Sequence, residues 1–371
     1  MRIVFVINSL IYGGAETQVL ALSRQLKAQG HVVAIYSLRP DNPRAAELDD
    51  SGVDVIADCK RGKFDLALLL RLRRFLRTFR ADIVHGFLLD GNLYATLAAA
   101  GTGIPALTSE RSDNYRWPFG HRLGLLLVRR LAAGLIANTH AGARFAQALF
   151  HLPAAHVHVV WNGIAMDADG RPRVPQAGTP GVEFFGSRDA KVACLVGQVK
   201  PEKDQCLALR VARVLIRKDP RWRVLLVGES LPQTRRYKES VLRLHDELGL
   251  GDAVAFAGLR PDVRRIIGGS NVLFSTSVHE GFPNVVLEAM AVGTPVVSTE
   301  YSDIRLILPD PSQVVASRDP EAIADAIILA DAQRSALGSR QRQWLESNGT
   351  IAAAARRLES IYSIYACAHS A

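Results

Sequence analysis

The sequence contains little cysteine, and its cysteines share no pattern. Its 371 residues include four cysteines, Cys59, Cys194, Cys206 and Cys367, and no two of them have C-x-x-C spacing. Such scatter argues against a disulfide scaffold and suggests no zinc site. We therefore expect four buried, reduced thiols in a cytoplasmic protein.

Long apolar runs are also absent. No segment has the about 18 uninterrupted apolar residues that a membrane-spanning helix needs. The first residues, MRIVFVINSL, form a short apolar run that is broken by Asn8 and Ser9, with no small-residue cleavage site after it. A first β-strand is therefore a better interpretation than a signal peptide.

Two common nucleotide motifs and a convincing metal site are missing as well. The sequence has neither the P-loop pattern of ATPases nor the G-x-G-x-x-G fingerprint of nicotinamide-binding domains. Asp167 and Asp169 form a bare D-x-D pair in a linker-like stretch. His151, His156 and His158 have no cysteine or carboxylate partner at metal-like spacing. We expect neither a metal nor a cofactor.

Positive charge, in contrast, is abundant and concentrated. The net charge is +9, and residues 60–80, KRGKFDLALLLRLRRFLRTFR, hold eight Lys/Arg and one Asp. Leucine and phenylalanine recur there at helical spacing, which predicts an amphipathic helix. Its basic face is either simply solvated or also in contact with an anionic membrane or a phosphate. The two interpretations are compatible.

The order of the predicted elements indicates an α/β protein. Short apolar runs alternate with helical patterns almost throughout, as in parallel sheets covered by helices. The length exceeds the usual limit of ~250–300 residues for one hydrophobic core. We expect two Rossmann-like domains that face each other across a cleft. Their expected ranges are 1–170 for the first domain, 171–190 for a linker and 191–351 for the second domain, with a helix of about 352–371 that can pack back on the first domain.

Two features of the first domain lie where parallel sheets bind ligands, beyond the carboxyl ends of strands. Gly13 and Gly14 follow a predicted strand and precede a helix, so the backbone there can approach an anion closely. His85 ends another predicted strand. The alternatives are a tight strand–helix turn and an ordinary strand-end histidine.

The loop GQVKPEKDQ follows the first predicted strand of the second domain. It carries Gln198, Lys200, Glu202 and Lys203. A lysine at this place can meet a phosphate as a point charge. The alternative is a solvated polar turn.

The stretch HEGFPNVVLEAM places two glutamates around a predicted helix start. Glu280 lies just beyond a strand, Pro283 and Asn284 begin the helix, and Glu288 lies one turn inside it. The amides of residues 284–286 would be unpaired and would favour an anion. Carboxylates accept hydrogen bonds from hydroxyls, so the stretch suits a sugar diphosphate. The alternative is that Glu280 only caps the helix.

Taken together, these motifs resemble the family-four glycosyltransferases, retaining enzymes of the GT-B fold, across essentially the whole chain. The most specific match is STSVHEGFPNVVLEAMAVGTPVVST, in which Glu280 and Glu288 fill the E-x7-E motif of that family. Further matches are INSLIYGGAETQVLALSRQLKAQGHVV, ADIVHGF, GIPALTSER, VVWNGI, LVGQVKPEKDQ and VAFAGLRPDV.

The resemblance implies that 1–170 is the acceptor-binding domain and 191–351 the nucleotide-sugar-binding domain, and it implies a role for each site residue. Glu280, His85 and Lys203 would be catalytic: Glu280 on the donor hydroxyls, His85 beside the reacting sugar and Lys203 on the diphosphate. Glu288 would bind the ribose, and the base would stack near residues 258–260. The other donor-binding residues would be Gly13, Gly14, Gln198, Lys200, Arg260, Gly281, Phe282, Pro283, Asn284 and Val285. Two positions depart from the family: Gln198 replaces a frequent arginine, and Phe87 replaces a second histidine.

The implied activity is transfer of a hexose-like sugar from a nucleotide-diphospho-sugar to an acceptor hydroxyl, with retention and without a metal or cofactor. A glycan or lipid-linked acceptor of cell-surface polysaccharide or glycolipid biosynthesis would fit. The protein would be cytoplasmic, and residues 60–80 would hold it at the inner face of the membrane. Nucleic acid is not an expected partner. The alternatives are a nucleotide-sugar epimerase of the same fold and a non-catalytic module that binds polyanions or membranes.

Overall fold

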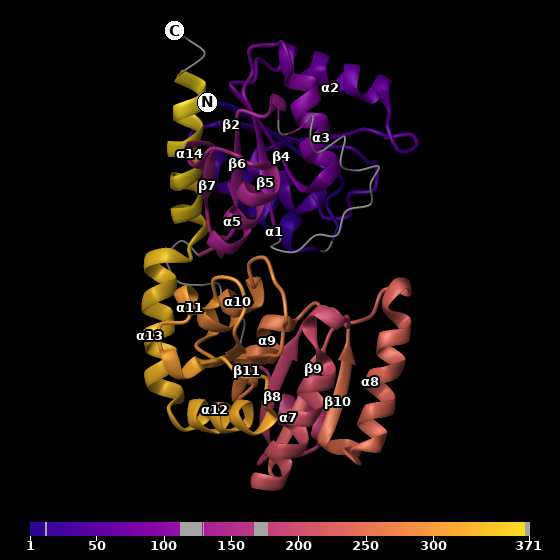
Figure 1. The fold of residues 1–371 in the computed structure, drawn as a ribbon, viewed down its shortest axis with the longest axis vertical. Helices are drawn as coiled ribbons and strands as arrows, with labels where there is room; N and C mark the ends of the chain where they lie inside the picture. Colours follow the sequence, from indigo (N-terminus) through magenta and orange to yellow (C-terminus); the bar gives the residue numbers. More distant parts are fainter. Residues whose placement is uncertain (12, 112–127, 129, 167–176, 368–371) are drawn as a thin grey trace. The chain divides into compact units, whose positions relative to one another are not determined.

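The computed structural model describes residues 1–11, 13–111, 128, 130–166 and 177–367. The chain divides into two compact units. The first combines Met1–Ala165 with Thr350–Ala371, and the second comprises Met166–Gly349. Each unit is a parallel sheet with interleaved helices (Figure 1). The expected α/β fold class is thereby confirmed.

The sheet of the first unit has seven parallel strands in the order β3-β2-β1-β4-β5-β6-β7. Strand order reverses between β1 and β4, where later strands begin to add on the other side. The strands are β1 (Arg2–Ile7), β2 (Val32–Ser37), β3 (Asp54–Ala57), β4 (Ile83–Gly86), β5 (Ala106–Glu110), β6 (Gly134–Ala137) and β7 (Val157–Val159).

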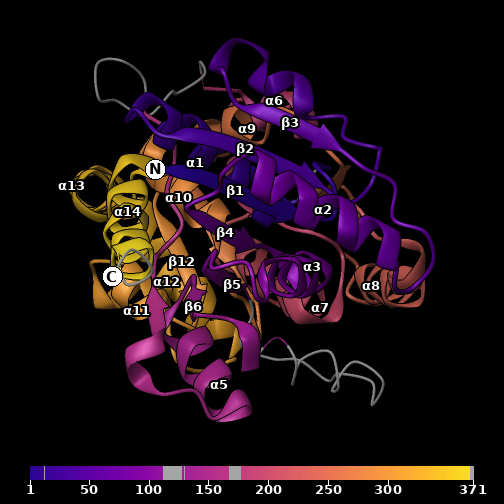
Figure 2. The same cartoon turned by 90° about the horizontal axis from the view of Figure 1, so that it is seen from above.

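The described helices of the first unit cover both faces of this sheet. They are α1 (Gly14–Ala28), α2 (Leu66–Thr78), α3 (Leu88–Ala99), α5 (His140–Phe150) and α14 (Ile351–Cys367), with the 3₁₀ helices η1 (Ala45–Ser51) and η2 (Ala154–His156). Ile3, Phe5 and Ile7 of β1 pack with α1 and α14, whereas Val4 and Val6 pack with α2 and α3. This alternation is the two-residue period of a strand buried on both faces. Figure 2 shows α14 and α3 on opposite sides of β1.

The C-terminal helix α14 belongs to the first unit, although the whole second unit precedes it in the chain. Ala355, Leu358 and Tyr362 are fully or almost fully buried in the core that also holds β1 and α1. Thr350 pairs with Ile164 in an isolated parallel bridge. The last helix therefore supplies one face of the first core.

The second sheet has six parallel strands in the order β10-β9-β8-β11-β12-β13. The strands are β8 (Lys191–Val196), β9 (Trp222–Val227), β10 (Val254–Gly258), β11 (Val272–Ser275), β12 (Val296–Thr299) and β13 (Val314–Val315). The helices are α6 (Pro180–Phe185), α7 (Gln205–Lys218), α8 (Arg235–Glu247), α9 (Val263–Gly269), α10 (Asn284–Val292), α11 (Ile304–Ile307), α12 (Pro320–Ala332) and α13 (Arg334–Asn348), with η3 (Pro201–Lys203), η4 (Pro232–Thr234), η5 (Gly251–Ala253) and η6 (Pro311–Gln313).

The predicted basic amphipathic helix is α2. Leu68, Leu72 and Leu76 are buried in the first core, as their spacing predicts. Leu66 and Leu70 instead lie on the exposed side, together with the arginines. Among the helices of the described residues, none is long and apolar enough to cross a membrane.

The cysteines are all free, but their predicted burial is only partly correct. Cys194 is buried and Cys206 is half-buried, whereas Cys59 and Cys367 are exposed. Cys59 lies in the loop after β3, and Cys367 ends α14. Scattered spacing says nothing about exposure, and the burial prediction is wrong for these two thiols.

Candidate active site

The strongest candidate site lies at the carboxyl ends of β8 and β11 in the second unit. These strands are neighbours, and strand order reverses between them. Loops that leave two such strands diverge, and the crevice between them is where open α/β sheets bind ligands. The loop after β8 carries Lys203, and the loop after β11 carries Glu280.

Lys203 and Glu280 meet at this place. The ammonium of Lys203 donates to Oε1 of Glu280, and their side chains are only 15% and 13% exposed. Ser277 Oγ donates to the same oxygen at 2.7 Å. A charge-assisted pair that is shielded from water holds its geometry better than a surface ion pair. The site thus presents one cation for a phosphate and one carboxylate for hydroxyl groups.

The position of Lys203 depends on the absence of a side chain at residue 197. A Cβ atom on Gly197 would lie 3.0 Å from Cε and 3.4 Å from Nζ of Lys203. Glycine therefore leaves the space in which the lysine lies over the strand end. Asp204 follows with a left-handed backbone (φ 45°), and its Oδ1 accepts the Leu207 amide at 3.0 Å at the start of α7. Aspartate tolerates this backbone region better than most residues.

The two loops are bonded to each other as well as to the pair. Thr276 Oγ1 donates to the carbonyl oxygens of Lys203 at 2.8 Å and Asp204 at 2.9 Å. The Val278 amide donates to the Glu202 carbonyl at 2.8 Å. These bonds hold the Lys203 loop against the Glu280 loop. Sequence reasoning missed Thr276 and Ser277, because polar residues between a strand and a motif carry no periodic signal.

The start of α10 corrects one expectation. The helix begins at Asn284, as predicted, with Pro283 before it. The Val286 amide, however, donates to the Pro283 carbonyl at 3.0 Å, so it is not an unpaired donor. Phe282 and Pro283 are buried, whereas Gly281, Asn284 and Val285 are half-buried. The last three are therefore the members of the predicted donor set that a ligand can reach here.

Glu288 has surroundings different from those of Glu280. It lies inside α10, 25% exposed, with its Oε1 atom 3.9 Å from Nε of Arg264 on α9. Burial raises the pKa of Glu288, and the charge of Arg264 opposes that shift. The two glutamates of the motif thus have separate cationic partners, as expected for two different roles.

The remaining predicted residues of the second unit have other partners, although the Lys200 carbonyl accepts the Lys203 amide at 3.0 Å. Arg260 binds Asp262 through both Nε (2.8 Å) and Nη2 (2.9 Å), and it also binds Glu183 at 2.9 Å. This arginine holds the pKa of Asp262 down at about 2. The Gln198 carbonyl accepts from Gln205 Nε2 at 3.0 Å. Lys200 is half-buried just before η3.

In the first unit, Gly13 caps α1 and Gly14 begins it. A Cβ atom on Gly13 would lie 2.2 Å from Oε2 of Glu16, so a side chain there would force this carboxylate to move. Glu16 is 7% exposed. Burial raises its pKa, and the charges of Arg111 and Arg44 oppose the shift. The glycine turn expected to approach an anion therefore already has a buried carboxyl group above it.

His85 lies in β4 and is 1% exposed. Its Nδ1 shares a hydrogen bond with Tyr362 Oη at 2.6 Å, and its Nε2 shares one with Ser109 Oγ at 2.8 Å. The Phe87 ring lies 4.4 Å away, centroid to centroid. Burial, with the charge of Arg111 as a second cause, lowers the pKa of His85 to about 3. Both nitrogens of this neutral imidazole are thus engaged within the first unit, and the catalytic role of His85 stays a prediction.

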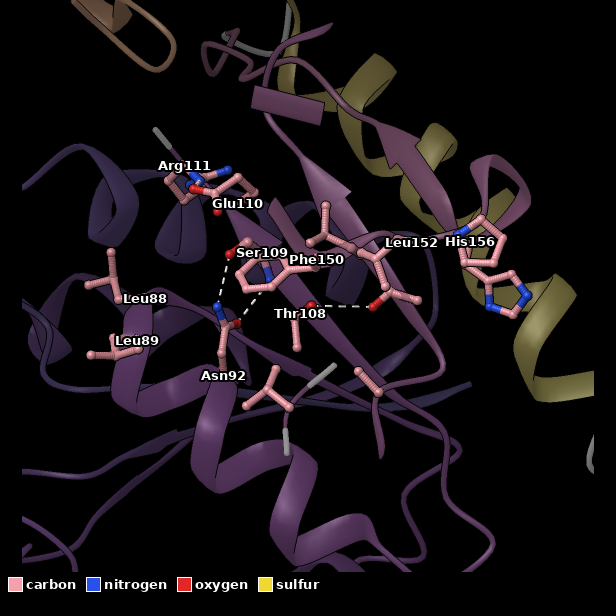
Figure 3. A pocket seen from close by; sticks show the side chains of 15 residues that line it. Leu88, Leu89, Asn92, Thr108, Ser109, Glu110, Arg111, Phe150, Leu152 and His156 are labelled. Carbon is pink, nitrogen blue, oxygen red and sulfur yellow. Dashed lines mark hydrogen bonds between the residues drawn. The ribbon is translucent and has the colours of Figure 1, made fainter. Parts of the chain in front are cut away.

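A cavity of about 260 Å³ lies beside Ser109 in the first unit (Figure 3). Its walls are mainly apolar and include Leu88, Leu89, Leu135, Phe150, Leu152 and Pro153. Glu110 and Arg111 lie together at one end. Asn92 fixes Ser109 through bonds of 2.9 Å to both its backbone N–H and C=O. The cavity was not predicted, because its walls come from separate strands and helices.

The residues weighed as metal ligands do not form a cluster. Among the described residues, no group of three His, Cys, Asp or Glu side chains could hold a metal ion. His156 Nδ1 contacts the Ala133 carbonyl, and His158 Nε2 contacts Tyr365 Oη. Asp167 and Asp169 lie outside the described residues.

Family models match both units. Residues 12–168 match the model described as Glycosyltransferase Family 4, and residues 190–330 match the model described as Glycosyl transferases group 1. The two ranges together span more than half of the chain. A D-inositol 3-phosphate glycosyltransferase of Frankia alni is 27% identical over 351 residues, which is 85% of each chain. A Thermobispora bispora protein of the same name is 26% identical over 326 residues, 79% of this chain and 75% of its own.

Solved structures share the fold. HepE of Anabaena in complex with UDP superposes with a TM-score of 0.80 at 18% identity, over 98% of this chain and 100% of its own. WaaG, a glycosyltransferase involved in lipopolysaccharide biosynthesis, superposes with a TM-score of 0.69 at 15% identity, over 98% of this chain and 99% of its own. Two Rossmann-like units, the E-x7-E motif and both family matches agree, and the chain belongs to the family-four glycosyltransferases of the GT-B fold.

Proposed function

We propose that the protein is a retaining glycosyltransferase that moves a hexose-like sugar from a nucleotide-diphospho-sugar to an acceptor hydroxyl. The observation that carries this proposal is the Lys203–Glu280 pair, which lies where strand order reverses and directly before α10. The structural neighbour HepE has been solved with UDP and with UDP-glucose, which supports a nucleotide-sugar donor.

Lys203 would bind the diphosphate. As the bond from the anomeric carbon to the phosphate oxygen breaks, negative charge grows on the leaving diphosphate. The Lys203 ammonium and the positive end of α10 stabilise that charge. Lys203 would exchange the Glu280 carboxylate for the phosphate when the donor binds. By the family analogy, these groups make a metal ion unnecessary.

Glu280 would then hold the sugar. Its released carboxylate accepts hydrogen bonds from donor hydroxyls, while Ser277 keeps it in place. In the retaining reaction of the family, the acceptor oxygen attacks the anomeric carbon on the face from which the diphosphate leaves. The acceptor proton passes to a leaving phosphate oxygen. Glu288, one turn further along α10, would bind the ribose.

The first unit would bind the acceptor. Its cavity has an apolar wall and a polar end at Glu110 and Arg111, which suits an acceptor with an apolar part (Figure 3). A lipid-linked or glycan acceptor of cell-surface polysaccharide or glycolipid biosynthesis fits this chemistry. The named role of WaaG in lipopolysaccharide biosynthesis supports the same class.

The decisive experiment identifies a donor and then follows the sugar. Thermal shift across a panel of nucleotide sugars finds the donor, because a ligand that binds only the folded state raises its melting temperature. Incubation with candidate acceptors and NMR of the product give the anomeric configuration. Lys203→Ala and Glu280→Ala should lose transfer, and Lys218→Ala, a surface lysine of α7, should keep it.

Several outcomes would overturn the proposal. Wild-type turnover in both Lys203→Ala and Glu280→Ala would show that the pair has no role in transfer. An inverted product would contradict retention. A rearranged nucleotide sugar without an acceptor would indicate an epimerase, and membrane or polyanion binding without nucleotide-sugar binding would indicate a non-catalytic module.

We also propose that residues 60–80 bind an anionic membrane, so that the protein is peripheral on the cytoplasmic face. Phe64, Leu66 and Leu70 are exposed by 52%, 60% and 57%. Arg74 and Arg77 lie exposed on the same helix. Apolar side chains that enter the lipid interface, flanked by cations that meet anionic headgroups, are the usual design of a membrane-binding helix.

Liposome co-sedimentation tests this surface. Vesicles with phosphatidylserine should retain the protein, and neutral vesicles should not. Replacing Leu66 and Leu70 by serine should abolish retention, whereas Leu242→Ser, an exposed leucine of α8, should not. Equal binding to both kinds of vesicle, or no effect of the double variant, would refute the proposal.

A further inference from the structure

Arg318 lies between β13 and α12, away from every predicted site residue in the sequence. Its guanidinium nevertheless reaches the edge of the sheet that carries Lys203 and Glu280. Nη2 donates to Asp204 Oδ2 at 2.7 Å and to the Thr276 carbonyl at 2.8 Å. Nη1 lies 3.3 Å from the Ser277 carbonyl. One side chain thus binds the loop after β8 and the loop after β11.

Each acceptor of Arg318 is directly connected to one member of the pair. Asp204 follows Lys203 in the chain, and Thr276 Oγ1 donates back to the Lys203 carbonyl at 2.8 Å. Ser277, whose carbonyl faces Arg318, donates through Oγ to Glu280 Oε1 at 2.7 Å. No hydrogen bond or ion pair between Arg318 and either side chain of the pair is found within the described residues. It therefore acts on both through their neighbours.

The geometry suits an arginine better than a lysine. The planar fork of arginine presents its nitrogens in a fixed arrangement that meets a carboxylate and two carbonyls, whereas a lysine ammonium is a single point charge on a flexible stem. The other carboxylate oxygen of Asp204 caps α7 through the Leu207 amide at 3.0 Å. Asp204 is thus held from both sides in its left-handed backbone. Besides Arg318, the bonds found between the two loops within the described residues are those of Thr276 and Val278 and the Lys203–Glu280 pair itself.

We propose that Arg318 is a positioning residue that fixes the spacing between Lys203 and Glu280. When a diphosphate separates the side chains of the pair, Arg318 keeps the spacing between the two loops unchanged. The cation then stays aimed at the leaving group and the carboxylate at the sugar. The kinetic part of this inference rests on the proposed transferase function, but the spacing itself does not.

The kinetic test compares Arg318→Met with Arg318→Lys. We expect kcat/KM to fall about tenfold in the methionine variant, mainly through kcat, because a misplaced donor loses transition-state contacts. Arg318→Lys should recover only a minor part of the kcat/KM that Arg318→Met loses. In a Lys203→Met background, Arg318→Met should have a clearly smaller effect, since the part that passes through that lysine is already lost. Independent, multiplying effects of the two substitutions would overturn the proposal.

A second test does not depend on activity. Reductive methylation of the folded protein, read by mass spectrometry of the Lys203 peptide, reports how firmly that amine is held. The rate should rise several-fold in Arg318→Met and less in Arg318→Lys. The control is Arg305→Met, because Arg305 also forms a bidentate pair, with Glu300, in the same unit. Arg305→Met should leave the rate unchanged.

The outcomes separate this inference from the proposed function. An unchanged methylation rate in both Arg318 variants would refute the positioning role, whatever the enzyme does. A raised rate in a protein that transfers no sugar would support the role and refute the transferase. Should Arg318→Met fail to fold, the methylation rate of Arg318→Lys relative to wild type decides the question.

Discussion

The two sheets place very different residues at the same topological position. In the first unit, strand order reverses between β1 and β4, and His85 of β4 is buried with both ring nitrogens bonded. In the second unit, it reverses between β8 and β11, and the edge carries the partly exposed Lys203–Glu280 pair. We call the carboxyl ends of β1 and β4 the first edge and those of β8 and β11 the second edge. The first edge is packed and uncharged at His85, whereas the second edge holds a cation and an anion.

This contrast shows that topology offers a site and that side chains decide its use. The first edge is filled from α14, because Tyr362 occupies one nitrogen of His85. The second edge stays open to chemistry, because Gly197 leaves room for Lys203. A charged, partly shielded pair can exchange its partners for a ligand, whereas a buried neutral imidazole with both nitrogens bonded contributes to the packing around it. Substitutions at the two edges should therefore affect different properties.

The largest effect should come from the second edge. Lys203→Met should lower kcat/KM by about 10²–10³, the scale of losing one preorganised transition-state donor. The free energy of unfolding should fall by about 1–3 kcal/mol, because the mostly shielded Glu280 carboxylate loses its cationic partner. Steady-state kinetics and urea unfolding measure both quantities. Lys218→Met, which removes a surface ion pair with Asp325, is the matched control and should change neither appreciably. Unchanged kcat/KM in Lys203→Met would erase the distinction between the edges.

The next effect should come from the first edge and should appear in stability. His85→Ala leaves a cavity and removes the partner of Tyr362 and Ser109, which should lower the free energy of unfolding by about 2–4 kcal/mol. Urea unfolding measures this loss of stability, and Tyr362→Phe should cause a smaller loss. Normal stability with a large loss of kcat would instead return His85 to a catalytic role.

The burial of His85 should also change how the free energy of unfolding depends on pH. The pKa of His85 is lowered to about 3 in the folded state, whereas an unfolded imidazole titrates near ~6.5. Between these values the unfolded state binds more protons, so stability falls as pH falls, by up to about 1.4 kcal/mol per pH unit. Above the unfolded pKa this group contributes no slope. Urea unfolding across the window should show a shallower acid slope in His85→Phe, and equal slopes would contradict the buried neutral histidine.

The smallest effect should come from the glycine beneath Lys203. Gly197→Ala would bring a methyl group to 3.0 Å from Lys203 Cε, so the lysine must shift by a few tenths of an ångström. We expect a several-fold loss of kcat/KM with little change in stability. Gly268→Ala, whose nearest neighbour would lie at 3.6 Å, serves as the control in kinetic and thermal-shift assays. Full activity in Gly197→Ala would show that Lys203 tolerates another position.

The sequence predicted most of the fold, because period-two and period-3.6 patterns depend on local neighbours. It also placed Lys203 and Glu280 beyond strand ends and α10 at Asn284. It could not show that the two side chains pair, since that requires β8 and β11 to be adjacent. The burial of His85 depends on Tyr362, 277 positions away.

Other features left no trace in any local pattern. From the sequence alone, Arg318 would be interpreted as a solvated residue before a helix cap. The proposed role becomes visible only in the structure, where β13 lies in the same sheet as β8 and β11. The exposure of Leu66 and Leu70 likewise could not be predicted from the sequence. Helical periodicity marked an apolar face, but the width of the buried stripe depends on how α2 rests on the first core.

The return of α14 to the first unit has a consequence for the newly made chain. Domains usually fold from the N-terminus as they leave the ribosome. Here β1 emerges early, yet Leu358 and Tyr362, which cover its Phe5 face, emerge only after the entire second unit. The unit whose synthesis starts first therefore completes its hydrophobic core last. Until α14 arrives, α1 covers only part of this apolar sheet face, and a chaperone that shields such surfaces would act on the N-terminal half.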